Sequence, residues 1–220
     1  CSNRHFICAE CVYGGIFGYL DETLIPILSE EFAKILGRCE ADLVYFQYLR
    51  TGTIDHCIAK TMPGLLCRSF LSKVEGHWRI TVPRDLNEFF NRLSRNHRRN
   101  LRRKIRDLEN AFPGQIRIMN YRSEQELAHG LPIAEEISKH TYQHALGVGL
   151  VNNPENLNIL LTAARKGWLH MSILFVKDSA CAFQWGIHYG NTLFLRELGY
   201  HPAWAKWNVG TVLLIKVLGD

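Results

Sequence analysis

The sequence contains no apolar run that approaches the ~20 residues required for a helix to span a bilayer. It also contains no low-complexity tract and no short internal repeat, which excludes fibrous and solenoid architectures. With 47% hydrophobic and 21% charged residues, its composition is that of a globular protein. At 220 residues, folding buries roughly 70% of the unfolded surface, enough for a core without disulfides. We expect one large domain, or two of about 100 residues each.

The seven cysteines are odd in number and scattered, without the spacing of a disulfide framework. Cys8 and Cys11 form a single CxxC pair. His5 and Cys1 would complete a set of four zinc ligands with this pair, but their spacing is too short for a convincing zinc site. We therefore expect no metal, reduced and mostly buried thiols, and a cytoplasmic location. The chain starts without methionine or a signal peptide and stops just after an apolar stretch, so we expect a fragment of a longer protein.

Positive charge is concentrated in one segment of the chain. From Arg92 to Arg106 there are eight basic residues and no acidic residue, although the formal net charge of the chain is only +5. The remainder is therefore net negative. The segment lies in a long predicted helix with Asp85 as its N-cap and Pro113-Gly114 as its stop signal. Because the apolar stripe thins near Asn96, we expect the helix to bend there or to cross a domain boundary.

The first third of the chain has mixed patterns. Apolar residues recur every three or four positions over Thr23–Leu36, which predicts a helix. The short aromatic and β-branched run Ala41–Leu49 predicts a buried strand. We expect a short helix over Thr53–Lys60 to follow, and then strands over Cys67–Lys73 and Trp78–Val82.

The second half has a regular order of elements. Alternation over Gln115–Tyr121 predicts a half-buried strand, and the capping box that starts at Ser123 opens a helix towards His140. Asn153 starts another helix that ends at Gly167. Three strands joined by hairpin turns and a last apolar helix are then predicted, over Trp168–Val176, Ala180–His188, Thr192–Leu198 and Val209–Leu218.

Two stretches are similar to motifs of a known family. Ser94–Arg103 is similar to a basic helix with the pattern S-x-x-x-R-x-x-L-R-R. Gly199–Pro202, followed by Trp207–Thr211, is similar to a strand end G-Y-D, a short gap and S-P-G before a helix. Together with the order of elements, they resemble the GNAT N-acetyltransferase superfamily. More narrowly, they resemble its CelD-like branch, which is linked to cellulose and exopolysaccharide biosynthesis and related to the FemAB aminoacyltransferases.

The sequence departs from this pattern at two places. His201 stands where the family has Asp, and Asn208-Val209 stands where it has Ser-Pro, whereas Gly210 is kept, so the turn can still form. The resemblance implies a mixed α/β fold with two GNAT-like halves. We expect residues 1–82 to form a degenerate and truncated N-terminal half. Residues 83–114 would form a basic connecting helix, and residues 115–220 an acetyltransferase half without its final strands.

The resemblance also implies acetyl-CoA or another acyl-CoA as co-substrate. Main-chain N–H groups at a helix N-terminus hold a pyrophosphate well, and the pantetheine arm would pair with the edge of strand 192–198. The alternative is that Gly210 is only a turn glycine before a buried helix. The expected cofactor-binding residues are Leu198, Trp207, Asn208, Val209, Gly210, Thr211 and Val212.

Acyl transfer to an amine requires a proton acceptor, and Glu197 is the candidate general base, acting through a water. The resemblance to GNAT enzymes that carry a base on this strand supports that role. The alternative is that Glu197 forms a structural ion pair with Arg196. Strand alternation puts these two residues on opposite faces. We expect Arg196 together with His140, Tyr142 and His144 to bind the acceptor, the last three flanking a glycine loop.

The basic helix has three interpretations, in decreasing order. Its arginines form a solvated or interdomain face. They bind an anionic partner, which could be the CoA 3′-phosphate, an acidic glycan or lipid headgroups. They bind nucleic acid such as tRNA, although no aromatic residue lies among them and no RNA-binding signature is present.

The sequence therefore predicts an acyl-CoA-dependent N-acyltransferase acting on an amine-bearing small molecule or glycan precursor in polysaccharide or cell-envelope biosynthesis. Two alternatives stay open. One is a FemAB-like transferase that uses aminoacyl-tRNA, and the other is a GNAT-like binding module without catalytic activity.

Overall fold

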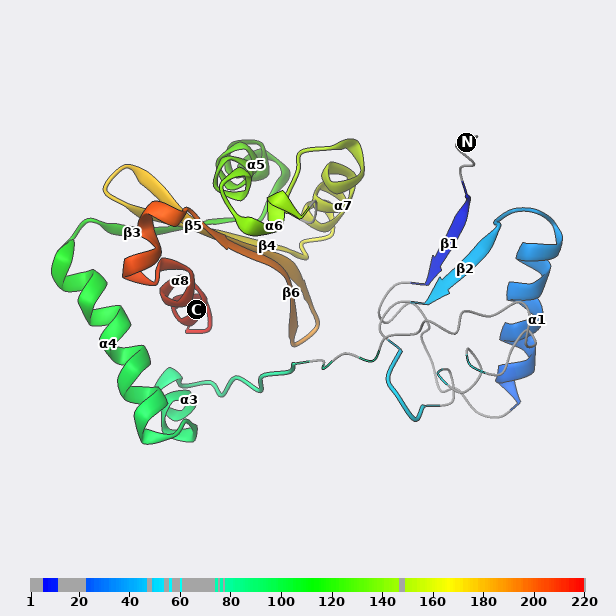
Figure 1. Cartoon of the computed structure of the whole chain (residues 1–220), viewed down its shortest axis with the longest axis horizontal. Coiled ribbons are helices and arrows are strands. Elements are labelled where there is room, and N and C mark those ends of the chain that lie inside the picture. Colours follow the sequence, from blue (N-terminus) through cyan, green and yellow to red (C-terminus); the bar gives the residue numbers. More distant parts are fainter. Residues whose placement is uncertain are drawn as a thin grey trace. The chain divides into compact units, whose positions relative to one another are not determined.

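The computed structural model describes residues 6–11, 23–46, 49–53, 56, 60, 74, 76, 78–146 and 149–219. Contacts divide the chain into two compact units, Cys1–Arg79 and Ile80–Asp220. Each unit contains its own sheet (Figure 1). The division falls close to the expected boundary at residue 82, while the assignment of the first unit as a GNAT-like half stays a prediction.

The first unit contains a parallel pair of strands with a helix between them in sequence. β1 (Cys8–Cys11) pairs with β2 (Leu43–Phe46), and α1 (Leu24–Gly37) is the crossover that parallel neighbours require. The Phe32 ring of α1 meets the Phe46 ring of β2 edge to face, with 5.0 Å between ring centroids. This aromatic contact fixes the helix against the strand pair.

The predictions for this unit have different outcomes. The helix expected over 23–36 is confirmed. The strand expected over 41–49 contains β2, but its residues alternate between exposed and half-buried instead of being buried. The helix expected over 53–60 and the strand expected over 67–73 lie largely or wholly outside the described residues.

The strand predicted over Trp78–Val82 is wrong. These residues form no regular structure, and Trp78 is 92% exposed. A strand needs a neighbour that satisfies its main-chain hydrogen bonds. Within the described part of the chain, no strand pairs with this segment, so its β-branched and aromatic residues do not suffice.

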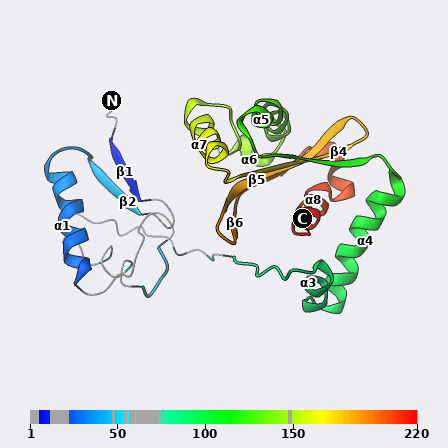
Figure 2. The same cartoon turned by 180° about the vertical axis from the view of Figure 1, so that it is seen from behind.

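The second unit is built on a four-stranded antiparallel sheet in the order β3-β4-β5-β6 (Figures 1 and 2). The half-buried strand and the three hairpin-linked strands predicted from the sequence are confirmed. Among the described strands, β6 has a neighbour on one side only. The bounds are β3 (Ile116–Tyr121), β4 (Leu169–Val176), β5 (Ser179–Tyr189) and β6 (Thr192–Tyr200).

Helices cover both faces of this sheet (Figures 1 and 2). β4 is buried at every position, because apolar side chains from helices pack against its two faces. One face carries α5 (Glu124–Lys139), α6 (Tyr142–Ala145) and α7 (Pro154–Arg165), and the other carries α4 (Arg95–Ala111) and α8 (Val209–Val217). None of the described helices combines the length and apolar character that crossing a bilayer requires.

The helix caps predicted from the sequence are confirmed. Ser123 and Glu126 form the full capping box of α5. Asn153 caps α7 by accepting a hydrogen bond from the backbone N–H of Asn156 at 2.8 Å. Gly167 follows the end of α7 with a φ of +68°, a conformation that favours glycine.

The long basic helix predicted from Asp85 is two helices. Asp85 caps α3 (Leu86–Arg92), and the chain is extended at Leu93. Ser94 then accepts a hydrogen bond from the backbone N–H of His97 at 3.3 Å and starts α4. The predicted bend is therefore confirmed, and its physical cause is a second N-cap inside the expected helix.

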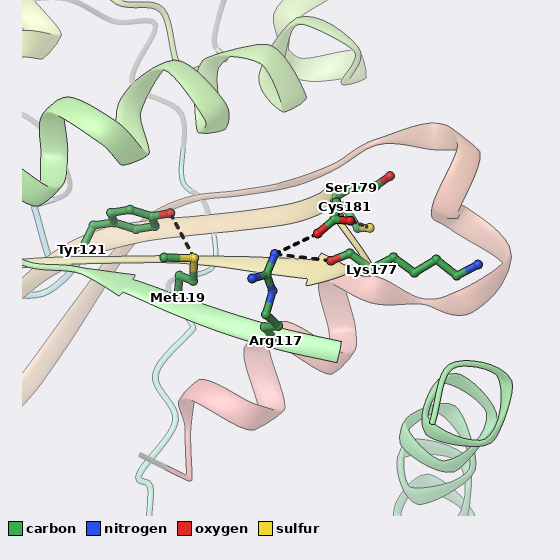
Figure 3. Close-up of polar contacts among 7 residues, drawn as sticks. Arg117, Met119, Tyr121, Lys177, Ser179 and Cys181 are labelled. Atoms are coloured by element: carbon green, nitrogen blue, oxygen red, sulfur yellow. Dashed lines mark hydrogen bonds and ion pairs between the residues drawn. The ribbon is translucent and has the colours of Figure 1, made fainter. Parts of the chain in front are cut away.

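Polar contacts anchor the β4–β5 turn to the edge strand β3 (Figure 3). The Arg117 guanidinium donates to the carbonyl of Lys177 and contacts the Asp178 carboxylate, both at 3.5 Å. After the turn, the Cys181 thiol donates to the carbonyl of Ser179 at 3.1 Å. Burial raises the pKa of Cys181 to about 11, so this thiol stays protonated at neutral pH.

Candidate functional site

A β-bulge interrupts the pairing of β5 with β6. Trp185 lies opposite Glu197, and Gly186 lies opposite Leu195, which leaves Arg196 as the additional residue on β6. A Cβ atom on Gly186 would lie 2.4 Å from the carbonyl oxygen of Phe194, closer than real atoms approach. Glycine at this position therefore allows the two strands to meet at the bulge.

The bulge changes the direction of the two charged side chains on β6. The Arg196 guanidinium carbon lies 6.0 Å from the ring centroid of Trp185, and the Glu197 carboxylate faces the same tryptophan. Simple alternation predicts opposite faces for Arg196 and Glu197, and that prediction is wrong. An extra residue in a strand shifts the alternation by one position, so both side chains reach one face.

Glu197 has the environment of a proton acceptor. It is half-buried, and burial raises its pKa above the ordinary carboxyl value. The side chain of Trp185, the backbone N–H of Leu150 and the charge of Arg196 oppose this shift. The buried indole nitrogen of Trp185 lies near the carboxylate but makes no hydrogen bond of good geometry. A carboxylate with a raised pKa is closer to the value that suits general-base catalysis at neutral pH.

The start of α8 presents main-chain amides without a side-chain cap. Asn208 precedes the helix in the left-handed conformation, with a φ of 53°, and makes no capping hydrogen bond. Its side-chain amide instead donates to the carbonyl of Lys206 at 3.4 Å. The backbone N–H of Val212 makes the first bond of the helix, to the carbonyl of Asn208 at 3.0 Å. The N–H groups before Val212 have no acceptor within the helix, which suits an anion such as a phosphate.

The side chains of the expected cofactor-binding residues lie in the core. Val209 and Val212 are fully buried. A Cβ atom on Gly210 would lie 3.1 Å from Leu198 Cδ2 and 3.2 Å from Tyr200 Cδ1, so this glycine also serves helix–strand packing. Gly210 is buried as well, so at the start of α8 only Asn208 and Thr211 are partly exposed. Trp207 packs edge to face on the ring of Phe112, at 5.3 Å between centroids.

His201 takes over a capping role at the end of β6. Its Nδ1 accepts a hydrogen bond from the backbone N–H of Ala203 at 3.2 Å, at the start of the 3₁₀-helix Pro202–Trp207. An Asp at this position, as in the family pattern, is a strong cap of the same kind. The replacement therefore keeps the local turn geometry through a different acceptor.

The structure places the expected acceptor-binding residues on different elements beside β6. His140, at the end of α5, lies against the ring of His201 at 4.5 Å and contacts Glu136 Oε1 at 3.4 Å through Nε2. Tyr142 is 72% exposed. The His144 backbone lies close to Gly149, where a Cβ atom would be 3.0 Å from the His144 Cα. His140 therefore lies near the β6 end, whereas Tyr142 and His144 belong to α6.

Sequence reasoning missed three groups next to β6. Gln143 Nε2 donates to the carbonyl of Leu198 at 3.4 Å, so α6 contacts the main chain of β6. The backbone of Leu150 and the side chain of Trp185 surround the Glu197 carboxylate. In the sequence, Leu150 has the pattern of a loop residue and Trp185 that of a core residue in an alternating strand. No sequence signal therefore marked either of them as a neighbour of Glu197.

Two shallow hollows lie elsewhere on the second unit. One, of about 330 Å³, is lined at the β3 edge by Glu109, Phe112, Gly114, Ile116, Ile118 and Lys216. The other, of about 290 Å³, is lined by Ile133, Glu136, Ile137, Ala180 and His201. The second reaches the residue that precedes the 3₁₀-helix, and neither is lined by Glu197. Among the described residues, no group of three or more His, Cys, Asp or Glu side chains is arranged to hold a metal ion.

The bulge gives a prediction about stability. Gly186→Ala should destabilise the second unit by about 1–3 kcal/mol, because the added methyl group meets backbone atoms that cannot move alone. Gly210→Ala is the matched control, since its methyl group meets only side-chain atoms of Leu198 and Tyr200, at 3.1 Å or more, and no backbone atom. Urea unfolding should give a clearly smaller loss for Gly210→Ala, and equal losses would contradict the strand contact at Gly186.

The raised pKa of Glu197 predicts a pH-dependent effect on stability. The folded state binds the proton more tightly than the unfolded state, so wild-type stability falls as the pH rises from the ordinary value of 4.5 through the folded pKa. Glu197→Gln should therefore be more stable than wild type at pH 7, and the difference should vanish near pH 4.

Glu126→Gln provides the control of opposite sign. Hydrogen bonds from the backbone N–H groups of Arg122 and Ser123 lower the pKa of Glu126. Its stabilising effect is present above the ordinary carboxyl pKa and is lost as the pH falls through the folded value. Urea unfolding from pH 4 to pH 8 measures both variants, and parallel pH profiles for the two would exclude the burial effect at Glu197.

The comparison with family models agrees with this fold. A family model described as an acetyltransferase (GNAT) domain matches residues 95–220. A crystal structure of a conserved protein of unknown function from Bacteroides thetaiotaomicron VPI-5482 is 14% identical, with a TM-score of 0.43. The similarity covers 61% of this chain and 44% of that chain, so this chain spans less than half of that protein's length. Among curated proteins none matches. Because the family match extends over more than half of its residues, the chain belongs to the GNAT acetyltransferase family.

Proposed function

We propose that this protein is an acyl-CoA-dependent N-acyltransferase that acts on an amine. The uncapped start of α8 is the single observation that carries the proposal, because it follows β6 after one short 3₁₀-helix and its first main-chain N–H groups have no acceptor within the helix, which suits a diphosphate. The exposed Lys206, just before this helix, adds a positive charge beside the same amides. Together these groups suit the pyrophosphate of acetyl-CoA or another acyl-CoA.

The strand edge provides the second part of the proposed site. β6 has no second neighbour among the described strands, so main-chain groups on that side are available for an extended ligand such as the pantetheine arm. The carbonyl of Leu198 already accepts from Gln143 there. In the proposed complex, the Gln143 side chain would either leave the Leu198 carbonyl and donate a hydrogen bond to the ligand, or keep its hydrogen bond to Leu198 and support the strand edge.

Glu197 would hold the proton in the reaction. The amine nitrogen of the acceptor forms a bond to the thioester carbon, and the carbon–sulfur bond breaks. Glu197 accepts the proton that the amine loses, through a water, and the CoA thiolate leaves and takes a proton from solvent. A half-buried carboxylate with a raised pKa holds that proton better than an exposed one.

Arg196 would orient the acceptor. Its guanidinium lies over Trp185, on the same side as Glu197, so an amine at Glu197 would have a cation next to it. That arrangement favours an acceptor with an anionic or hydroxyl-rich group beside its amine, such as a glycan precursor. The CelD-like motifs support a role in polysaccharide or cell-envelope biosynthesis, in which Tyr142 and His144 of α6 would contact the acceptor.

Acetyl-CoA binding should protect the protein against thermal unfolding. At a concentration about 100 times the Kd, the stabilisation amounts to about 2.7 kcal/mol. Thr211→Glu should abolish this protection, because it puts a negative charge at the amides that would hold the diphosphate, while a carboxylate in the first helical turn preserves folding. Gly210→Glu should abolish it as well, but that variant also crowds Leu198 and Tyr200.

Lys166→Glu is the control for charge, since Lys166 is an exposed residue at the end of α7. It should retain full protection by acetyl-CoA. Loss of protection in Lys166→Glu as well as in Thr211→Glu would contradict the proposed cofactor site. So would the absence of protection of the wild-type protein at millimolar acetyl-CoA.

Glu197→Gln should separate binding from chemistry. The variant should retain protection by acetyl-CoA, but its release of free CoA thiol with a panel of amines should fall by about 10²–10⁴-fold. Asp107→Asn, at an exposed position of α4 on the other face of the sheet, is the control and should leave the rate unchanged. Equal rates for wild type and Glu197→Gln would remove Glu197 from the mechanism without removing the cofactor site.

A further inference from the structure

Six arginines lie on one side of α4. Successive residues of an α-helix are about 100° apart around its axis, so all six fall within an arc of about 140° and extend along about 16 Å of the helix. Five of them are exposed and one is half-buried. We call this side the arginine face: Arg95, Arg98, Arg99, Arg102, Arg103 and Arg106.

The arginine face is not needed to hold α4 in place. Leu101 and Leu108, on the other side of the helix, are buried, and Leu108 packs with residues of α8 such as Val212 and Leu213. Core packing of this kind supplies most of the stability of a surface helix. The arginines therefore contribute little to the fold, and their role lies on the outer surface.

The charges of the arginine face are not neutralised. Within the described part of the chain, none of the six forms an ion pair with an acidic residue. Their side-chain partners are neutral: Arg98 donates to Asn91 at 2.8 Å, and Arg102 lies 5.1 Å from the centre of the Phe90 ring.

Three acidic residues lie near this face, and two of them are already paired. Glu88 binds Arg92, and Glu109 binds Lys216 at 2.6 Å. The third, Asp107, is exposed on α4 and forms no ion pair with a described residue, so one negative charge faces six positive ones. Like charges on adjacent turns repel by a few tenths of a kcal/mol per pair. A set of repelling, unpaired charges on a rigid helix indicates an anionic partner from outside the described chain.

The chemistry of the arginine side chains indicates which class of anion they bind. All six are arginines rather than lysines, and the planar guanidinium matches a phosphate or carboxylate with two parallel hydrogen bonds. A helix that lies on a bilayer turns apolar side chains toward the acyl chains. The apolar side of α4 is instead buried against α8, and the arginine face has no exposed apolar residue. A lipid surface is therefore disfavoured.

The shape of the face distinguishes between nucleic acids. Single strands are bound by aromatic side chains that stack on bases, and the arginine face has none. A convex helix with cations on both flanks fits a groove bordered by two rows of phosphates, and an α-helix fits the major groove of duplex DNA. We propose that the arginine face binds the phosphate backbone of duplex DNA without reading its sequence. This inference does not depend on the proposed acyl transfer.

The test compares two triple variants of the whole chain in fluorescence anisotropy with short labelled duplexes of DNA and RNA. Arg95→Gln/Arg99→Gln/Arg106→Gln removes three charges from the arginine face, and glutamine preserves helix propensity. The control, Lys139→Gln/Arg165→Gln/Lys166→Gln, lowers the net charge by the same amount on the opposite side of the sheet, where Lys139 and Arg165 are paired with Glu136 and Glu124. Circular dichroism and thermal unfolding establish that both variants are folded.

The arginine-face variant should bind about tenfold or more weakly at low salt than the wild-type protein. The slope of log K against log salt should decrease in magnitude by about 3 for duplex DNA, while the control variant should match the wild type. Binding of the DNA duplex that depends on the face supports the proposal, whereas tighter binding of the RNA duplex, whose major groove is too narrow for a helix, would contradict it.

Equal weakening of binding in both variants would overturn the proposal. So would no binding of the DNA duplex at low salt, whether or not the protein binds phosphatidylglycerol vesicles. Preference for single strands over both duplexes would also contradict the groove geometry.

Discussion

The close approach of β5 and β6 at Gly186 is the constraint on which the candidate site depends. Only glycine leaves room for the main chain of Phe194, and the extra residue at Arg196 then shifts the alternation of β6. Arg196 and Glu197 consequently share the side of Trp185. The same strand leads through the 3₁₀-helix Pro202–Trp207 to the start of α8, so the charged side chains and the helix terminus belong to one continuous stretch of chain.

The strands of the second unit differ in how deeply they are buried, and this difference matches their roles. β4 is buried on both faces and acts as the rigid centre, whereas β6, at the edge, retains exposed and half-buried positions. Groups that perform chemistry must be accessible, but their geometry requires support from a packed core. Glu197 satisfies both conditions, because burial raises its pKa while it remains on the edge strand.

The two faces of α4 show a similar division. Its apolar side completes the core with α8, and its other side has a concentration of positive charge that no described acidic residue neutralises. The segment recognised from sequence as a basic helix is thus an integral part of the acetyltransferase unit. Whether the first unit is a second GNAT-like half, and whether the protein is of the CelD-like branch, remain predictions.

Local signals in the sequence were sufficient for much of the fold. The capping box at Ser123, the alternation over residues 115–121 and the hairpin turns act between residues close in sequence, so they can be read without a structure. The prediction of a strand over Trp78–Val82 was wrong because a strand requires a pairing partner that is distant in the sequence.

The amino-acid sequence by itself determined the order of elements, the charge of α4 and the identity of Glu197 as a candidate base. The tertiary structure alone decided that Arg196 and Glu197 share a face, that His201 caps a turn, and that Gln143 contacts β6. These outcomes depend on a one-residue bulge and on contacts between residues far apart in the chain. Propensity and periodicity describe neighbours along the chain and carry no information about such contacts.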